Sequence, residues 1–237
     1  MLGRIKCLFP NDLALFYKCY PLFVRKRGFY KMKNEKTEVV FILDRSGSMC
    51  GLESDTIGGF NGMLEKQKKV EGEAFLTTVL FDDRFEVLHA HKDIKDVKPL
   101  TEDDYYTRGC TALLDAIGRT IGMIDRDCTK VVFTIITDGL ENASREFSLK
   151  QIKKMIDEKT EKGWEFIFLG ANIDAIETAG SMGIAANRSA NYINDSKGVD
   201  TNFKFLNRAI SAMRTDCECL DEAFAMVNDD YNNRKSN

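Results

Sequence analysis

The chain has 237 residues, of which 30% are charged and 43% are hydrophobic, and its net charge at pH 7 is −3. This composition is typical of a soluble globular protein with one core. The small net charge argues against nucleic acid as a partner. The seven cysteines are scattered and odd in number, which favours reduced thiols in the cytoplasm over a disulfide framework.

Residues 1–31 differ from the rest of the chain because they contain seven Lys/Arg residues and a single acid, Asp12. Their longest unbroken apolar run, Leu13–Tyr17, is shorter than the roughly 7–15 residues of a signal-peptide core, and a membrane span needs about 20. A basic arm on a membrane surface is one interpretation. We favour another, in which Met32 is the true start and residues 1–36 are an extension outside the domain.

Strand-like apolar runs alternate with helical patterns from residue 37 onward. Strands are expected over 38–43, 73–81, 84–91, 130–137 and 164–170, and helices over 52–69, 110–125, 148–163, 174–183 and 200–214. This alternation predicts an α/β domain over residues 37–215, with a doubly wound, mostly parallel sheet and helices on both faces. The short Asp82-Asp83 connection adds one antiparallel edge strand. Residues 216–237 are expected to form a loosely held acidic and polar tail.

Three oxygen-bearing side chains follow the first predicted strand, at Asp44, Ser46 and Ser48. In open α/β sheets, ligands bind at the carboxyl ends of the strands, and alternate side chains of an extended segment point the same way. The three side chains can therefore converge on a hard cation. The same residue types are also ordinary in turns and helix caps, so this stretch alone leaves both interpretations open.

Two further stretches favour the cation. Thr111 precedes a predicted helix in "RGCTALLDAIG", and Asp138 ends another apolar run in "IITDGLENAS". Together with "DRSGS", these stretches resemble the von Willebrand factor type A (VWA) domain and its metal-ion-dependent adhesion site (MIDAS). The resemblance covers roughly residues 37–215. It is nearest to the small intracellular bacterial type, as in tellurium-resistance-associated proteins.

This resemblance implies a Rossmann-like fold and a role for each site residue. Ser46 and Ser48 would bind the metal directly, and Thr111 would do so when a partner is engaged, whereas Asp44 and Asp138 would act largely through bound water. The implied cofactor is Mg²⁺, with Mn²⁺ or Ca²⁺ as alternatives. The implied function is that of a cytoplasmic, non-enzymatic module whose metal binds an Asp or Glu side chain of a partner protein.

Four residues beside these stretches are candidates for contacts with the partner around the metal: Arg45, Arg108, Glu141 and Asn142. The two arginines would flank the cation and steer an acidic partner toward it. Both are also consistent with solvated loop charges.

A phosphohydrolase-like α/β enzyme that uses Asp44 and Mg²⁺ is the alternative function. Phosphatases of the haloacid dehalogenase type also place an aspartate at the end of the first strand. Their motif needs a second aspartate two residues later as the general acid, and Ser46 occupies that position here. The two histidines, His89 and His91, are expected on one face of an edge strand, where they would form an incomplete metal site.

Overall fold

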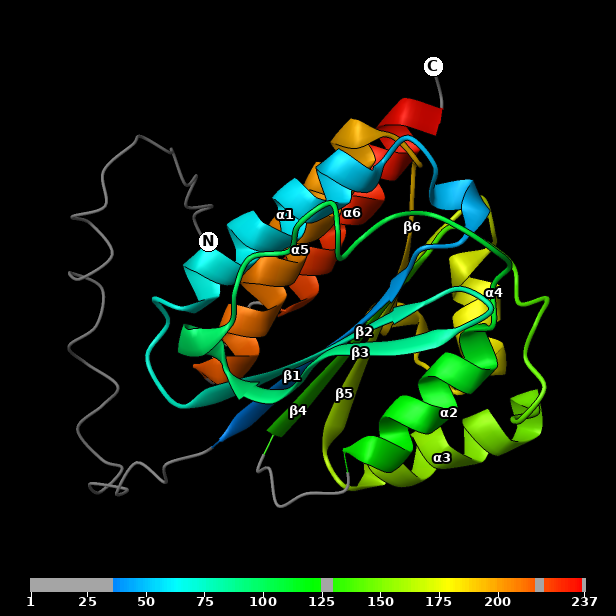
Figure 1. The fold of residues 1–237 in the computed structure, drawn as a ribbon, viewed down its shortest axis with the longest axis horizontal. Helices are drawn as coiled ribbons and strands as arrows, with labels where there is room; N and C mark the ends of the chain where they lie inside the picture. The colour runs from blue at the N-terminus through cyan, green and yellow to red at the C-terminus, as the bar shows by residue number, and fades with distance from the viewer. Residues whose placement is uncertain (1–35, 125–129, 216–219, 236–237) are drawn as a thin grey trace, which may run out of the picture. The chain divides into compact units, whose positions relative to one another are not determined.

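The computed structural model describes residues 36–124, 130–215 and 220–235. Within them, six strands form one sheet in the order β3-β2-β1-β4-β5-β6 (Figure 1). The strands are β1 (Thr37–Asp44), β2 (Ala74–Phe81), β3 (Phe85–Asp93), β4 (Lys130–Thr137), β5 (Trp164–Ala171) and β6 (Ser189–Tyr192). The predicted extension over residues 1–36 lies outside the described residues, except for Lys36.

The sheet is parallel except at one edge. β1 pairs in parallel with both β2 and β4, and the parallel pairing continues through β5 to β6. β3 pairs antiparallel with β2, because the connection at residues 82–84 is too short for the crossover that a parallel pair needs. This arrangement confirms the predicted, mostly parallel sheet with one antiparallel edge strand.

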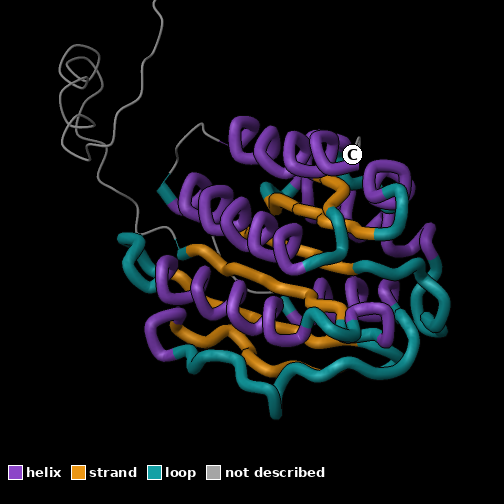
Figure 2. Tube along the Cα trace, turned by 90° about the horizontal axis from the view of Figure 1, so that it is seen from above, coloured by secondary structure: helices purple, strands orange, loops and turns teal. Residues whose placement is uncertain are grey.

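Helices cover both faces of the sheet. They are α1 (Glu53–Gln67), α2 (Leu113–Met123), α3 (Leu149–Glu161), α4 (Ala175–Ser181), α5 (Ser196–Arg214) and α6 (Leu220–Lys235). α1, α5 and α6 pack on one face, and α2, α3 and α4 pack on the other (Figure 1). Figure 2 shows helices lying side by side along the strands. None of the described helices combines the length and the apolar character that crossing a membrane requires.

The central strand β1 is buried on both sides. Val39, Phe41 and Leu43 belong to the core under α1, α5 and α6, whereas Val40 and Ile42 belong to the core under α2, α3 and α4. All five side chains are at most 1% exposed. A strand covered on both faces needs apolar residues at every position, which explains the continuous apolar run in the sequence. The run ends where the sheet ends, and the polar site begins there.

The predicted loose tail over residues 216–237 is wrong for the part that the structure describes, because Leu220–Lys235 form helix α6. Three side chains of α6 are buried in the core that it shares with α5: Ala223, Phe224 and Val227. The ring of Phe224 lies 4.6 Å from that of Phe205. A narrow apolar stripe among acidic and polar residues was enough to fix this helix by tertiary packing.

The two histidines of β3 lie on opposite faces, contrary to the prediction. The register between β2 and β3 shifts twice, and such bulges break the alternation of side chains along a strand. His89 is buried opposite Thr78. His91 stacks on Phe75 and contacts Glu38, with its Nδ1 at 2.5 Å from the carboxylate. The pair therefore cannot share one metal ion.

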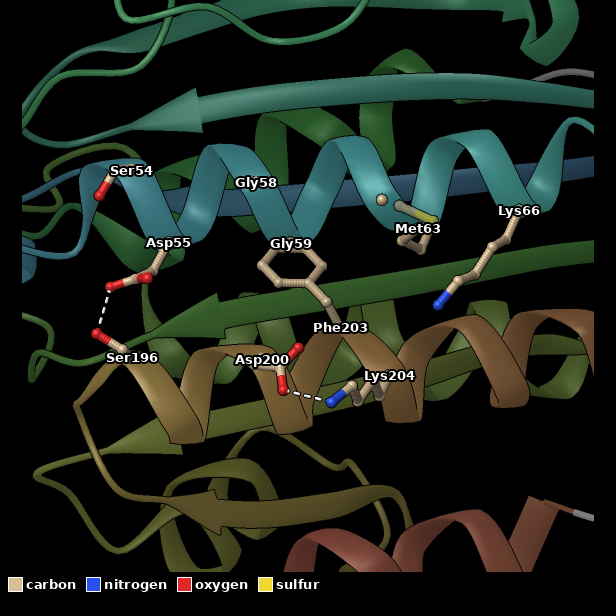
Figure 3. A pocket seen from close by; sticks show the side chains of 11 residues that line it. Ser54, Asp55, Gly58, Gly59, Met63, Lys66, Ser196, Asp200, Phe203 and Lys204 are labelled. Carbon is tan, nitrogen blue, oxygen red and sulfur yellow. Dashed lines mark hydrogen bonds and ion pairs between the residues drawn. The ribbon is translucent and has the colours of Figure 1, made fainter.

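A groove of about 380 Å³ lies between α1 and α5 (Figure 3). Glycines on α1 open this groove and allow the two helices to approach, since a Cβ atom at Gly59 would lie 2.2 Å from the ring of Phe203. None of the predicted site residues lines the groove. The candidate site is therefore elsewhere, at the ends of the strands.

Candidate metal centre

The predicted site residues meet at the carboxyl end of the sheet, between β1 and β4. Asp44 is the last residue of β1, and Asp138 directly follows β4. Because these strands are parallel neighbours, both carboxylates reach the same edge of the sheet. Thr111 arrives from the loop before α2. That loop is joined to the loop after β1 by a hydrogen bond from Gly47 N–H to the Gly109 carbonyl oxygen, at 3.2 Å.

Serine hydroxyls link the ends of the two strands. The Oγ atoms of Ser46 and Ser48 lie 3.1 Å apart, and Ser48 Oγ donates a hydrogen bond to Asp138 Oδ1 at 2.6 Å. The two hydroxyls lie together as predicted, but not through the extended segment that the prediction assumed, because Gly47–Met49 form a 3₁₀ turn. Oxygen atoms from two loops that are far apart in the chain are thus in direct contact.

Asp44 is buried and held by two hydrogen bonds. Its Oδ1 accepts from the Ser46 N–H at 2.7 Å, and its Oδ2 accepts from Thr137 Oγ1 at 2.6 Å. The hydroxyl of Tyr105 donates to the main-chain oxygen of Asp44 at 2.5 Å. The sequence pattern did not indicate Thr137 or Tyr105. The place of Thr137 immediately before Asp138 is the one signal that could have drawn attention to it.

Gly139 keeps a space open beside the hydroxyl of Thr111. A Cβ atom at Gly139 would lie 2.8 Å from Thr111 Oγ1 and 3.4 Å from Ser48 Oγ. Both hydroxyls therefore face the same small volume, which any side chain at Gly139 would fill. The close approach, rather than an unusual backbone conformation, is what requires glycine at this position.

Burial raises the pKa of both carboxylates of the site. Burial raises the pKa of Asp44 to about 6, even though hydrogen bonds from Thr137 and Ser46 lower it, and the charge of Asp138 adds to the rise. Burial also raises the pKa of Asp138, against hydrogen bonds from Ser48 and Asn194 that lower it. A bound cation would relieve both effects by favouring the ionised forms.

Asn194 is a further residue of the site that the sequence pattern did not indicate. It follows β6, a strand of only four residues that has no long apolar run to reveal it. The side-chain N–H of Asn194 donates to Asp138 Oδ2 at 2.8 Å. Both oxygens of the Asp138 carboxylate therefore accept a hydrogen bond, one from Ser48 and one from Asn194, and the carboxylate is fixed in orientation.

Arg45 does not lie on the surface around the site, where the sequence analysis placed it as a candidate. Its side chain is fully buried, with Nε 2.9 Å from Asp82 Oδ2 and Nη2 2.7 Å from the carboxylate of Glu86. Arg108 is partly exposed and donates from Nε to the same Asp82 oxygen at 2.7 Å. The two arginines thus share Asp82 and tie the loop after β1 to the loop that carries Thr111.

Glu141, which is partly buried, and Asn142, which is exposed, support the Thr111 loop through hydrogen bonds. The side-chain oxygen of Asn142 accepts from the Thr111 N–H at 3.0 Å, and the Asn142 N–H donates to the Thr111 carbonyl oxygen at 3.0 Å. Glu141 Oε2 accepts from the Leu114 N–H at 2.9 Å, in the first turn of α2, where a carboxylate is favourable. Contacts of Glu141 and Asn142 with a partner remain a prediction.

The donor set is made of oxygen atoms alone. The described residues contain no group of three or more His, Cys, Asp or Glu side chains placed to hold a metal ion. The site instead combines two carboxylates with the hydroxyls of Ser46, Ser48 and Thr111. Oxygen donors of this kind suit hard cations such as Mg²⁺, Ca²⁺ and Mn²⁺, whereas Zn²⁺ in proteins is bound mainly by nitrogen and sulfur.

Solved structures with a similar fold include proximal thread matrix protein 1 from the mussel byssus, with a zinc-occupied MIDAS motif. It is 14% identical, with a TM-score of 0.56 over 75% of this chain and 46% of that chain. The PilB minor pilin from Streptococcus sanguinis is 9% identical, with a TM-score of 0.57 over 76% and 62% of the two chains. A von Willebrand factor type A protein from Catenulispora acidiphila is 14% identical, with a TM-score of 0.51 over 75% and 43%.

These likenesses show that the chain has a VWA fold. At such low identities they show the fold alone, and the chain spans less than two thirds of the length of each of these proteins. No family model matches the sequence, and no curated protein does either.

Proposed function

We propose that this chain is a protein-binding module that holds a divalent cation, Mg²⁺, at the carboxyl end of its sheet and uses it to bind an acidic side chain of a partner. The observation that carries this proposal is the convergence of five oxygen-bearing side chains from three separate loops: Asp44, Ser46, Ser48, Thr111 and Asp138. Turn or capping roles would explain each residue alone. They would not explain why Asp44, Ser46, Ser48 and Asp138 are linked by hydrogen bonds and close contacts, nor why the hydroxyls of Thr111 and Ser48 face a space that Gly139 keeps open.

The residues present fit such an ion. Ser46, Ser48 and Thr111 offer neutral hydroxyl oxygens, and Asp44 and Asp138 supply two negative charges that balance the ion. Mg²⁺ loses its water reluctantly and usually retains several water molecules, so the carboxylates can act through bound water. The pKa values of both aspartates are raised because burial disfavours their ionised forms. A cation between them would stabilise these ionised forms.

Neutral ligands in direct contact leave the cation with affinity for a further anionic oxygen. When bound, the ion supplies a positive centre that accepts a carboxylate from another protein. The chain's own part is to orient its hydroxyls and to keep the position near Gly139 free. Arg108, which is partly exposed, adds positive charge nearby and would favour the approach of an acidic partner.

Proteins of similar fold support the proposal. The mussel thread matrix protein carries zinc in a MIDAS motif, so a divalent ion can occupy the corresponding motif in a protein of this fold. We propose Mg²⁺ here, rather than zinc, because the ligand set of this chain is composed of oxygen atoms. Mn²⁺ and Ca²⁺ are expected to bind as substitutes.

We also propose that the module is not an enzyme. Ser46 stands where a phosphatase of the haloacid dehalogenase type needs its general acid, and a serine hydroxyl is too weak an acid to take the place of a carboxylic acid at neutral pH. Tyr105 lies near Asp44, but burial raises its pKa well above the ordinary value and its hydroxyl donates to a main-chain oxygen. We therefore expect no hydrolysis of phosphate monoesters in Mg²⁺.

The experiment that tests this function compares capture of proteins from a cell extract in Mg²⁺ and in excess chelator. A partner should be retained in Mg²⁺ and released by the chelator, and Asp44→Ala should lose both metal and partner. Thr111→Ala should retain appreciable Mg²⁺ affinity but lose most of the partner. This substitution removes no helix cap, because the cap position of α2 is Ala112. Capture that persists in chelator or in Asp44→Ala would contradict the proposed function.

A further inference from the structure

Two large apolar side chains in the loops at the carboxyl end of the sheet are exposed to solvent. Leu140 is 64% exposed and Tyr106 is 43% exposed. Leu140 directly follows Gly139, whose Cβ position lies 2.8 Å from Thr111 Oγ1, and Tyr106 is in the loop that leads to Thr111. A single exposed apolar residue is ordinary in a folded protein. The loop of Tyr106 is joined to the loop after β1 by a hydrogen bond from the Arg108 N–H to the Arg45 carbonyl oxygen. Two such residues in loops at the site's edge of the sheet indicate a contact surface.

Tyr106 is held in place before any partner arrives. Two guanidinium groups lie over its ring, that of Arg45 at 5.4 Å and that of Arg108 at 5.2 Å from the ring centre. Its hydroxyl accepts a hydrogen bond from Arg108 Nη1 at 3.0 Å. Contacts between a cation and a ring face are attractive, so the exposed ring has little freedom to lose on binding.

The loop that carries Leu140 is also fixed. Its far end is anchored by Asp115, whose carboxylate accepts three hydrogen bonds from the main-chain N–H groups of residues 145–147, at 2.8–2.9 Å. Its near end is anchored by Glu141 and Asn142 at the start of α2. A surface that is ordered in advance costs less conformational entropy when it binds. Leu140 is therefore presented to solvent by a rigid support.

We propose that the partner's metal-binding carboxylate is flanked by a large apolar side chain, Leu, Ile, Met or Phe, which packs against Leu140 and Tyr106. This inference rests on the proposed function and narrows the class of partner. A wholly polar acidic segment would leave both apolar side chains in water. The partly exposed guanidinium of Arg108 beside Tyr106 disfavours a basic residue next to the carboxylate.

A displayed peptide library with one fixed aspartate and random neighbours provides the test. The full chain is the bait, in Mg²⁺, and bound peptides are released with chelator. Leu, Ile, Met or Phe should be enriched within about three residues of the aspartate, a span that an extended peptide covers in roughly 10 Å. The best peptide should bind Leu140→Ser about tenfold more weakly, which corresponds to ~1.4 kcal/mol, because the apolar contact is lost, and Leu140→Met should restore binding.

Met123 provides the matched control. It is also exposed, at 38%, but it lies at the opposite end of α2 from Thr111, so Met123→Ser should leave peptide affinity unchanged. Mg²⁺ affinity, measured by calorimetry, should be equal in all three variants and the wild type. Enrichment of acidic peptides without apolar neighbours, or unchanged affinity in Leu140→Ser, would overturn the inference and leave the proposed function intact. If no peptide binds in a Mg²⁺-dependent manner, the proposed function fails and the inference fails with it.

Discussion

Ser48 and Asp138 are hydrogen-bonded at 2.6 Å although 90 residues separate them in the chain. The bond joins the loop after β1 to the end of β4, two strands that the sheet places side by side. It exists because each strand ends at the same edge, where its apolar run gives way to polar residues. A short sequence motif becomes a site only through this pairing of strands.

Gly139→Ala tests whether the space beside Thr111 is needed for the ion. The added Cβ would lie 2.8 Å from Thr111 Oγ1, closer than real contacts allow, so the hydroxyl must move or the space must close. We expect Mg²⁺ affinity to fall at least about tenfold, which corresponds to ~1.4 kcal/mol, with little change in the melting temperature of the metal-free protein. Calorimetry and thermal unfolding in chelator measure the two quantities.

Gly58→Ala is the control for this substitution. Gly58 is an exposed residue within α1, and a Cβ there meets no atom within 4 Å. Alanine should stabilise the helix by about 1 kcal/mol and leave Mg²⁺ affinity unchanged. An equal loss of Mg²⁺ affinity in both variants would show that the effect of Gly139→Ala is not local.

Asp44→Asn should stabilise the metal-free protein at neutral pH. Burial raises the pKa of Asp44 to about 6, so the folded protein binds this proton more tightly than the unfolded chain does. Ionising Asp44 therefore lowers the free energy of unfolding. This loss is absent below pH ~4, grows as the pH rises to about 6, and reaches its full size above pH ~6. Asparagine avoids this loss, and its N–H can donate to Thr137 Oγ1. We expect a gain of about 2–3 kcal/mol at pH 7.5 in chelator.

Unfolding in urea at pH 4 and pH 7.5 would measure this effect. The stability difference between Asp44→Asn and the wild type should be small at pH 4 and large at pH 7.5, and Mg²⁺ should stabilise only the wild type. Asp103→Asn, at an exposed position, serves as the control. The prediction would be contradicted if, in chelator, the free energy of unfolding of the wild type increased relative to that of Asp44→Asn as the pH rises.

Asp82→Ala should be strongly destabilising, because it removes the shared partner of two arginines. Arg45 is fully buried and would retain only its ion pair with the half-exposed Glu86, and removing one partner of a buried ion pair typically costs roughly 3–5 kcal/mol. The loop that carries Thr111 should also loosen, since Arg108 loses the same partner. Urea unfolding measures the loss. The neighbouring Asp83→Ala, at an exposed position, should change the free energy of unfolding by well under 1 kcal/mol. Equal effects from the two substitutions would rule out the buried ion pair.

Phe224→Ala tests whether helix α6 is packed on the domain or forms a loose tail. Phe224 is 4% exposed and its ring lies 4.6 Å from that of Phe205. Removing a buried aromatic side chain costs roughly 3–5 kcal/mol, which should appear as a lower midpoint of urea unfolding. The exposed Asp229→Ala on the same helix should have almost no effect. A midpoint that does not move in Phe224→Ala would mean that α6 adds nothing to the stability of the domain.

The elements that the sequence predicts best are those with long apolar runs. β1 and β4 are buried on both faces and read as strands without any tertiary information. β6 has four residues with no such run, and α6 has a narrow apolar stripe that only packing against α5 completes. For the same reason Asn194, which follows β6, could not be assigned to the site: its link to Asp138 depends on the position of a strand that the sequence does not reveal.

The five oxygen donors could be predicted from their residue types and from their positions at the ends of predicted strands. The residues that pack around these donors could not be predicted in this way. The alternation after β1 predicts that Ser46 and Ser48 face together, and they do. The sequence analysis placed Arg45 around the cation, whereas its burial against Asp82 depends on the turn between β2 and β3. Charged residues in loops are mostly exposed, so a buried arginine is not expected unless its partner is known.

The central claim is that a divalent cation binds among the side chains at the ends of β1 and β4. Anomalous diffraction from crystals grown with Mn²⁺, which can replace Mg²⁺ and scatters anomalously, tests it most directly. We predict one strong peak in contact with the hydroxyl oxygens of Ser46 and Ser48, beside Gly139, and no peak there in crystals of Asp44→Ala. A well-ordered crystal in saturating Mn²⁺ that shows no peak at this position, or the same peak in Asp44→Ala, would contradict the claim.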